Sequence, residues 1–277
     1  YRGAGRTHKL AGEMKGWLVA LALSAVVVAA GVGLWITWDS TQPAPADGIS
    51  ANADLLVTPP TTAPPSTTTT VPLPSCEPGS EPVIGDPESD WATAVVDTRH
   101  RMPEDFVPPD LVDVVEAGFE TRDQVRALVV QDLAALRSAA EASGTPIVVV
   151  SGYRSFGYQR GLFEERVAQV GEEEAAANIA RPGHSEHQLG TAVDVLGPEG
   201  GELSTAFGAT PTGRWLQEHA HEFGFVISYP EGASGATCYD YEPWHLRYVG
   251  RDNATAIHES GLTPREWMHA QRTAGGR

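Results

Sequence analysis

The sequence predicts an α+β domain over residues 76–277, in which helices pack on a small antiparallel sheet. Two observations favour this fold class. Segments with helical apolar spacing are mixed with short apolar runs typical of strands, and the predicted strands lie close together late in the chain. No internal repeat occurs along the sequence.

The N-terminal residues predict one transmembrane helix over residues 17–38. These 22 positions contain no charged residue, and about 20 apolar residues span a bilayer as a helix. Residues 1–16 carry four basic side chains and one acid, and basic flanks tend to stay cytoplasmic. A cleaved signal peptide is the alternative, but its apolar region is usually about 7–15 residues long. We therefore expect a cytoplasmic tail (1–16), a single-pass membrane anchor and an extracytoplasmic remainder.

Residues 39–75 predict a disordered linker between the anchor and the domain. They hold eight prolines and many threonines, a composition that cannot bury a core. In polyproline II form the segment would reach on the order of 100 Å. Such a spacer would carry the domain from a membrane into a cell wall.

The first part of the domain, whose core we place at about residues 90–268, predicts a helix, a strand and a second helix. Apolar residues at positions 125, 128, 129, 133 and 136 recur at helical spacing, so residues 122–143 predict an amphipathic helix. Thr145-Pro146 ends it, and the β-branched run 147–150 predicts a buried strand. Residues 155–180 again show apolar side chains along one helical face.

Short strands dominate the second part of the domain. The apolar runs 192–196, 225–229 and 244–249 predict strands. Residues 212–223 predict a helix closed by Gly224, because glycine readily adopts the left-handed conformation that ends helices. Thr263-Pro264 begins a last short helix, with threonine as the cap and proline in the first turn.

The charge balance excludes one class of partner. The net charge is −17, and residues 76–277 carry all of this excess. Nucleic-acid phosphates are bound by clustered Lys and Arg side chains. We therefore expect no nucleic-acid partner.

The two cysteines, Cys76 and Cys238, can form a disulfide in an exported domain. The bond would tie the start of the domain to a loop just before Tyr241-Glu242. Two free thiols are the alternative. Neither cysteine belongs to a C-x-x-C pair, so a thiolate zinc site is not expected.

Two polar clusters, residues 181–194 and 241–247, contain the side chains of a metal centre. Together they offer three ligands and one further acid: His187, Asp194, His245 and Glu242. Two histidines and a carboxylate, with a fourth position left for water, make a catalytic zinc site, and a nearby carboxylate can take the proton of that water. Each cluster alone is also explained as a polar loop before a strand, or as a solvated acid near a core histidine.

Three ordered motifs carry a family resemblance. They are Ser151-Gly-Tyr-Arg-Ser155, Ser185-x-His187-x-x-Gly190-x-Ala192-x-Asp194 and Glu242-Pro-Trp-His245-Leu-Arg-Tyr-Val-Gly250. In this combination, over about residues 90–268, the chain resembles the D-alanyl-D-alanine carboxypeptidases of the VanY type. These form one zinc peptidase group with the VanX dipeptidases and hedgehog-like domains.

The resemblance implies a role for each site residue. His187, Asp194 and His245 would bind Zn²⁺, and Glu242 would act as general base and then as general acid. Arg154 would stabilise the oxyanion. Two further residues would orient the substrate or the site, or would serve only as cap or turn residues: Ser185 and Gln159.

The implied reaction is hydrolysis of the terminal D-Ala-D-Ala bond of peptidoglycan stem peptides. An L,D-peptidase, an endopeptidase acting on peptidoglycan cross-links and a non-catalytic zinc-fold module that binds the wall are the alternatives. Related sequences often carry a basic residue where Ser228 stands, and the loop 231–240 contains Cys238. This loop borders the site in the resemblance, so the resemblance says least about substrate choice.

Overall fold

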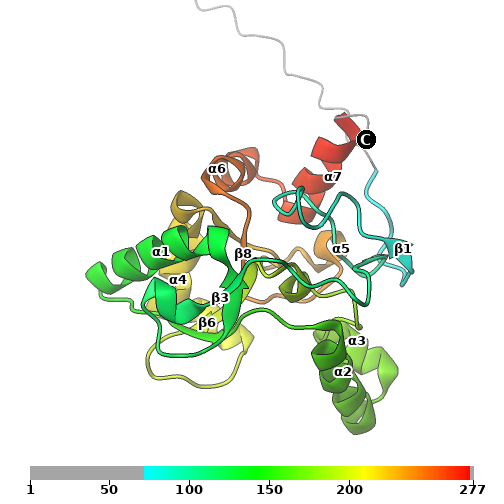
Figure 1. The fold of residues 1–277 in the computed structure, drawn as a ribbon, viewed down its shortest axis with the longest axis horizontal. Helices are drawn as coiled ribbons and strands as arrows, with labels where there is room; N and C mark the ends of the chain where they lie inside the picture. Colours follow the sequence, from blue (N-terminus) through cyan, green and yellow to red (C-terminus); the bar gives the residue numbers. More distant parts are fainter. Residues whose placement is uncertain (1–71, 275–277) are drawn as a thin grey trace, which may run out of the picture. The chain divides into compact units, whose positions relative to one another are not determined.

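The computed structural model describes residues 72–274 (Figure 1). The predicted cytoplasmic tail (1–16), the predicted transmembrane helix (17–38) and nearly all of the predicted linker (39–75) lie outside the described residues. Those three assignments stay predictions. Within residues 72–274, no helix is long and apolar enough to cross a bilayer.

A four-stranded antiparallel sheet in the order β5-β6-β8-β7 lies at the centre of the domain. Its strands are β5 (Val148–Ser151), β6 (Ala192–Leu196), β8 (His245–Tyr248) and β7 (Phe225–Ile227). All four were expected from the apolar runs, within one or two residues at each end. The two central strands are buried along their whole length, because both faces of the sheet are covered there.

The two faces of the central strands have different chemistry. In the register of β6 with β8, Val193 pairs with Leu246 and Asp194 pairs with His245. Side chains alternate between faces along a strand, so the apolar pair points into the hydrophobic core and the polar pair points to the opposite face. Helices α1 (Val130–Ala142) and α4 (Pro211–His219) contribute to that core, which holds most of the fully buried aliphatic side chains.

Three predicted helices end or begin differently in the structure. The helix expected at 122–143 is wrong over its first turns, where β4 (Gln124–Arg126) pairs with β3 (Leu111–Asp113) and a 3-10 turn η2 (Ala127–Val129) precedes α1. Tertiary partners override the helical spacing here, because Arg126 donates hydrogen bonds from Nε to Asp110 and from its backbone N–H to the carbonyl of Gly190.

The segment 155–180 forms two helices rather than one. Helix α2 (Phe156–Val170) ends at Gly171, whose φ of 87° is unfavourable for other residues, and α3 (Glu172–Asn178) follows directly. The helix expected at 212–223 forms α4 and then tightens into the 3-10 turn η5 (Ala220–Phe223), closed by Gly224 as predicted.

The last helix, α7 (Pro264–Ala274), begins with the predicted threonine cap. The backbone N–H of Glu266 donates to Thr263 Oγ1 at 3.2 Å, and the Glu266 carboxylate accepts from the Thr263 backbone N–H at 2.9 Å, which together make a capping box. The remaining elements were not predicted: β1 (Glu81–Pro82), β2 (His100–Arg101), η1 (Val114–Ala117), η3 (Glu186–Leu189), η4 (Thr205–Ala209), α5 (Ser234–Thr237) and α6 (Arg251–Ser260).

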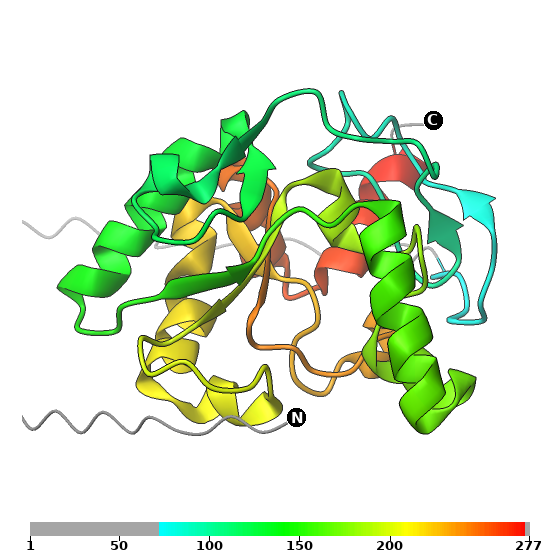
Figure 2. The same ribbon diagram turned by 60° about the horizontal axis from the view of Figure 1, so that its bottom comes forward.

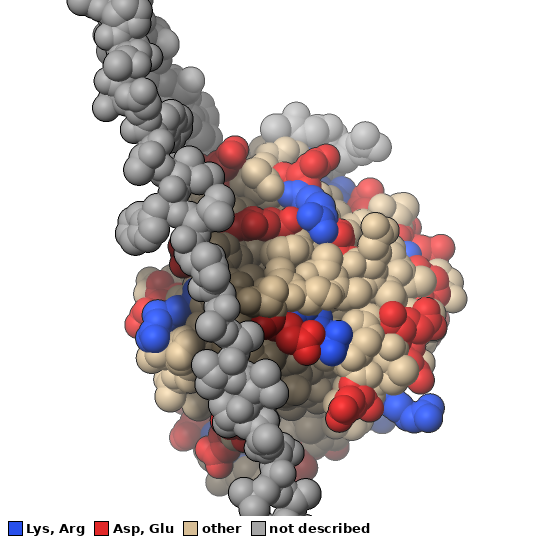
Figure 3. All heavy atoms as spheres, turned by 90° about the vertical axis from the view of Figure 1, so that its left-hand side faces the viewer, with Lys and Arg blue, Asp and Glu red and all other residues tan. Residues whose placement is uncertain are grey.

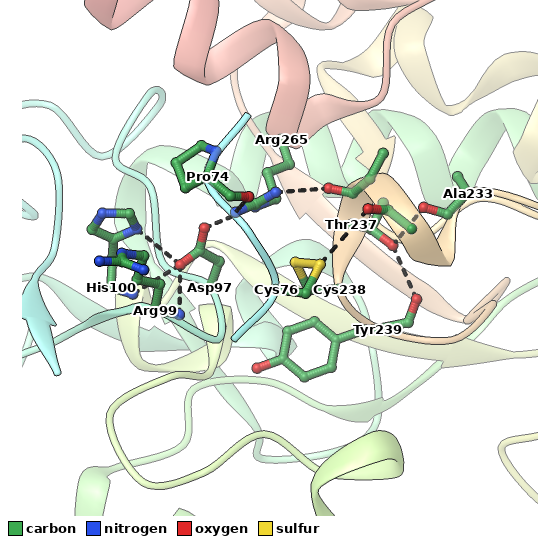
Figure 4. The surroundings of a disulfide bond; sticks show 12 residues. Pro74, Cys76, Asp97, Arg99, His100, Ala233, Thr237, Cys238, Tyr239 and Arg265 are labelled. Carbon is green, nitrogen blue, oxygen red and sulfur yellow. Dashed lines mark hydrogen bonds and ion pairs between the residues drawn. A yellow bond between two sulfur atoms is a disulfide. The ribbon is translucent and has the colours of Figure 1, made fainter. Parts of the chain in front are cut away.

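A disulfide joins the start of the described chain to the loop before β8. Cys76 and Cys238 are bonded across a sequence separation of 162 residues (Figure 4). Beside them, Arg265 of α7 donates hydrogen bonds to the backbone carbonyls of Pro74 and Ala236. The N-terminal segment, the loop and α7 are therefore held together at one place.

The buried carboxylate of Asp97 holds the same junction from the other side. Its Oδ1 accepts hydrogen bonds from the backbone N–H groups of Arg99 and His100 and from His100 Nδ1, and its Oδ2 accepts one from Arg265 Nε at 2.7 Å. Burial alone would raise the pKa of Asp97, but hydrogen bonds from His100 and His269 and the Arg265 guanidinium outweigh it and hold the pKa well below its ordinary range.

Acidic side chains are spread over the face of the domain that is seen from the side of α1 (Figure 3). Basic side chains are fewer there and stand singly among the acids. Where side chains are visible, this face shows no gathered basic side chains of the kind that bind nucleic-acid phosphates.

Replacing both Cys76 and Cys238 by serine is expected to lower the free energy of unfolding by about 2–5 kcal/mol, because the bond restricts a long loop in the unfolded chain. Urea unfolding of the full chain, with and without a thiol reductant, measures the effect. The reductant should lower the midpoint of the wild type and leave that of the double serine variant unchanged. A wild-type midpoint that does not respond to the reductant would contradict the prediction.

Asp97→Asn is expected to lower the free energy of unfolding by about 3–5 kcal/mol at pH 7, since it leaves buried cationic groups without their carboxylate. The pKa of Asp97 in the folded state lies below its unfolded value of about 3.9, so its stabilisation is complete above that pH and is lost as the pH falls further. The difference in the free energy of unfolding between wild type and Asp97→Asn should therefore narrow below about pH 4. Asp105→Asn, at an exposed position, is the control. A stability difference between wild type and Asp97→Asn that does not change with pH would rule out stabilisation by the ionised Asp97 carboxylate.

Candidate active site

The strand register brings two of the predicted metal ligands together. Asp194 of β6 and His245 of β8 are directly paired and face away from the core. His187 arrives from η3, the turn that precedes β6. Gly190 makes the reversal between them at a φ of 72°, where a side chain would also press on Arg126.

The three side chains direct acceptor atoms at one point. His187 Nε2 lies 3.3 Å and His245 Nδ1 lies 3.2 Å from the same carboxylate oxygen, Oδ1 of Asp194. All three residues are buried. Their candidate ligand atoms lie within 4.8 Å of one another. Two imidazole nitrogens and a carboxylate oxygen at this spacing are the donor set of a tetrahedral site with one open position.

Hydrogen bonding leaves a free lone pair on His187. Its Nδ1 lies 2.6 Å from the carbonyl oxygen of Gly152, which can only accept, so Nδ1 carries the proton. In the neutral imidazole Nε2 is then unprotonated, and this buried atom has no hydrogen-bond partner among the described residues. A metal ion would satisfy that atom, so the residues present fit a bound cation.

The charges of the centre favour a cation as well. Burial, assisted by the charge of Arg154, lowers the pKa of His187 to about 4, so this imidazole is neutral as a ligand must be. Burial also disfavours the His245 imidazolium, but hydrogen bonds with Asp194 and Glu186 outweigh it and raise the pKa to about 10. A positive charge between the carboxylates is therefore stabilised, whether a proton or a metal ion supplies it.

Glu242 and Arg154 flank this centre. Glu242 Oε2 lies 3.9 Å from His245 Nδ1, and burial raises the pKa of Glu242 to about 7, partly opposed by His245. Arg154 follows β5, and its Nη2 lies 3.6 Å from Asp194 Oδ2. The Arg154 Nε is buried without a hydrogen-bond partner among residues 72–274. An acid and a guanidinium with donors to spare thus stand beside the candidate metal ligands.

A cleft of about 550 Å³ opens over the centre. Its walls come from α2 and α3, from residues 203–205 and from the segment 229–245. In Figure 2, α2 stands at the right and the η4 segment, in yellow, lies at the lower left, with strands of the sheet between them in this view. Seven residues predicted from the sequence line the cleft: Arg154, Gln159, Ser185, His187, Asp194, Glu242 and His245.

The two predicted orienting residues differ in their surroundings. Ser185 occupies the position before η3, and its side chain makes no capping hydrogen bond there. Gln159 Nε2 donates to the carbonyl of Ala180 at 2.7 Å, which ties α2 to the segment after α3. Gln159 Oε1 has no partner within the described part of the chain, so this oxygen is free to accept a hydrogen bond from a ligand.

The sequence motifs did not identify Glu186, the residue between Ser185 and His187, as part of the site. Its buried carboxylate accepts hydrogen bonds from Ser228 Oγ at 2.6 Å, from Arg247 Nη1 at 2.6 Å and from His245 Nε2 at 3.0 Å. The only sequence signal was its place beside a predicted ligand. The partners that explain it are distant in sequence and could not be assigned without the fold.

A second group of potential ligands, formed by Asp97, His100 and His269, is explained by structural hydrogen bonds. Oδ1 of Asp97 already accepts two backbone N–H groups and His100 Nδ1, while Oδ2 accepts Arg265 Nε. A metal ion would compete with these donors and would lie close to the Arg265 guanidinium. We therefore assign this group to the junction near the disulfide.

Known proteins share these features. The family model described as VanY, D-alanyl-D-alanine carboxypeptidase, matches residues 122–251. A D-alanyl-D-alanine carboxypeptidase of Enterococcus faecalis is 32% identical over 198 residues, which are 67% of this chain and 68% of the relative. YodJ of Bacillus subtilis is 41% identical over 180 residues, 63% of this chain and 66% of YodJ, so the match leaves about a third of that relative uncovered.

Solved structures agree with the sequence matches. The LdcB LD-carboxypeptidase is 36% identical with a TM-score of 0.57, and the match covers 63% of this chain and 84% of LdcB. A variant of the vancomycin-resistance D,D-pentapeptidase VanY in complex with Zn(II) is 30% identical with a TM-score of 0.56, covering 64% and 99%. VanYB in complex with D-alanine-D-alanine is 31% identical with a TM-score of 0.56, covering 65% and 98%.

The family model thus matches the segment that carries the convergent histidines and the candidate catalytic carboxylate. The chain belongs to the VanY family of D-alanyl-D-alanine carboxypeptidases.

Proposed function

We propose that the chain is a zinc-dependent carboxypeptidase that hydrolyses the terminal D-Ala-D-Ala bond of peptidoglycan stem peptides. One observation carries the proposal: His187 Nε2 and His245 Nδ1 converge on Asp194 Oδ1 at the base of a cleft, beside Glu242. The VanY structure with Zn(II) and the VanYB complex with D-alanine-D-alanine support the choice of metal and of substrate class.

The chain's own residues have distinct roles in this proposal. Zinc held by His187, Asp194 and His245 would supply a Lewis acid and lower the pKa of a water molecule to about 7. Glu242 takes the proton of the attacking water and then delivers it to the departing D-alanine amine. Arg154 faces the carbonyl oxygen and stabilises the negative charge that develops there.

An L,D-carboxypeptidase is the second candidate, favoured by the likeness to LdcB. The chemistry would be the same, and only the residue before the released D-alanine would differ. A stem pentapeptide ending in D-Ala-D-Ala and a tetrapeptide ending in one D-Ala separate the two activities. A non-catalytic wall-binding module would cleave neither peptide and would have no use for Glu242.

Glu242→Gln is expected to lower the turnover of the zinc-loaded full chain on the pentapeptide by about 10²–10⁴-fold, because the amide cannot accept the water proton. Arg154→Lys is expected to cost about 10²–10³-fold, since the fixed guanidinium donors are lost. Mass spectrometry follows loss of a single alanine, and bound zinc is measured in every sample.

Glu231→Gln and Arg160→Lys are the matched controls, since Glu231 and Arg160 are exposed and neither lines the cleft. Both controls should keep wild-type turnover. Cleavage of the tetrapeptide in place of the pentapeptide would replace the proposed specificity by the second candidate. Undiminished turnover of zinc-loaded Glu242→Gln would remove Glu242 from the mechanism.

We also propose that the domain functions outside the cytoplasm, anchored through residues 17–38 by its own N-terminal helix. The uncharged stretch in the sequence and the Cys76–Cys238 bond support this location, because disulfides persist in oxidising compartments. Protease added to cells stripped of their wall but with intact membranes should digest the domain, together with an exported marker. A domain that stays protected while the marker is degraded would refute the proposed location.

A further inference from the structure

Glu186 lies directly behind the candidate metal centre. It is buried and does not line the cleft, so it has no path to a substrate. Its carboxylate nevertheless reaches the centre through His245, whose Nε2 lies 3.0 Å from Glu186 Oε2. That imidazole is therefore the side chain of the candidate centre that the Glu186 carboxylate contacts directly.

Both ring nitrogens of His245 lie close to a carboxylate oxygen: Nδ1 is 3.2 Å from Asp194 Oδ1, and Nε2 is 3.0 Å from Glu186 Oε2. A metal ion bound to Asp194 would take the lone pair of Nδ1, so the proton of the neutral ring would lie on Nε2 and donate to Glu186. His187 is arranged the opposite way, with Nδ1 donating to the Gly152 carbonyl and Nε2 facing Asp194. The two histidines therefore need different tautomers, and each has its own acceptor.

We propose that Glu186 is a positioning residue that fixes the tautomer and ring orientation of His245 and thereby sets the affinity of the centre for zinc. The inference rests on the zinc site of the proposed function. Metal-bound histidines commonly donate their other ring N–H to a carboxylate, which orients the ring and makes the ligand more basic.

An ion pair with Arg247 holds the Glu186 carboxylate in place. An isolated buried carboxylate is strongly disfavoured, but Arg247 Nη1 lies 2.6 Å from Glu186 Oε1, and Arg247 is almost completely buried. The other end of the guanidinium, Nη2, donates to the backbone carbonyls of Trp91 and Ala94 at 3.1 and 2.7 Å. Residues 91–94 precede the segment 122–251 that matches the family model, so the N-terminal segment of this chain helps to hold a metal ligand in place.

Glu186→Gln tests the proposal, because glutamine can donate as well as accept and no longer specifies the tautomer. We expect the zinc affinity of the full chain, measured by competition with a chromogenic chelator, to fall by about 10–100-fold. Ser228→Ala is the matched control. It removes another hydrogen bond to the same carboxylate oxygen but leaves the imidazole contact, so affinity should stay within about threefold of wild type.

A second variant and a spectrum separate positioning from folding. Glu186→Gln strands the charge of Arg247, so the double variant E186Q/R247M removes that charge too and should show the same weakened zinc binding. In zinc-loaded wild type, long-range ¹H–¹⁵N correlation spectra should show His245 protonated on Nε2 and His187 protonated on Nδ1.

Wild-type zinc affinity in either folded variant, or a His245 ring bound to zinc through Nε2, would overturn the proposal. Failure to hydrolyse either peptide, with zinc affinity and tautomers as expected, would count only against the proposed activity. A wild-type chain that binds no zinc would overturn both.

Discussion

The pairing of β6 with β8 is the constraint on which the rest of the site depends. In the observed register, Val193 and Leu246 enter the core while Asp194 and His245 meet on the other face. A slip by one residue would exchange the two faces, burying a carboxylate among aliphatic side chains and exposing valine. The hydrophobic effect that holds the sheet together therefore also sets the spacing of two candidate metal ligands.

Next to this strand pair, each buried carboxylate lies beside basic side chains. Asp194 lies among His187, His245 and Arg154, while Glu186 lies between His245 and Arg247. Each buried carboxylate therefore has basic partners, and none is buried as an unpaired ion. The same arrangement leaves His187 Nε2 without a hydrogen-bond partner among the described residues, which is what a site prepared for a cation requires.

The segment before residue 122 contributes support rather than chemistry. Through the carbonyls of Trp91 and Ala94 it holds Arg247, and through Asp97 and the Cys76–Cys238 bond it holds α7 and the loop that leads to Glu242. That loop forms one wall of the cleft. The disulfide and Arg265 fasten this loop at Cys238 and Ala236, a few residues before Glu242 (Figure 4).

The strands, the helix ends and the candidate metal ligands could be predicted from the sequence. The features that could not be predicted share one cause. The strands were evident because apolar runs between breaker residues are a local signal, and Gly224 and Thr263 marked helix ends by their own chemistry. The ordered motifs brought His187, Asp194, His245, Glu242 and Arg154 together as one expected centre. What local patterns could not show was the strand at Gln124–Arg126, where Asp110 and the Gly190 carbonyl override helical spacing, or the role of Glu186. Hydrogen bonds between residues distant in sequence produce no periodic pattern in the chain, so only the tertiary structure decided which nitrogen of each histidine faces the candidate metal centre.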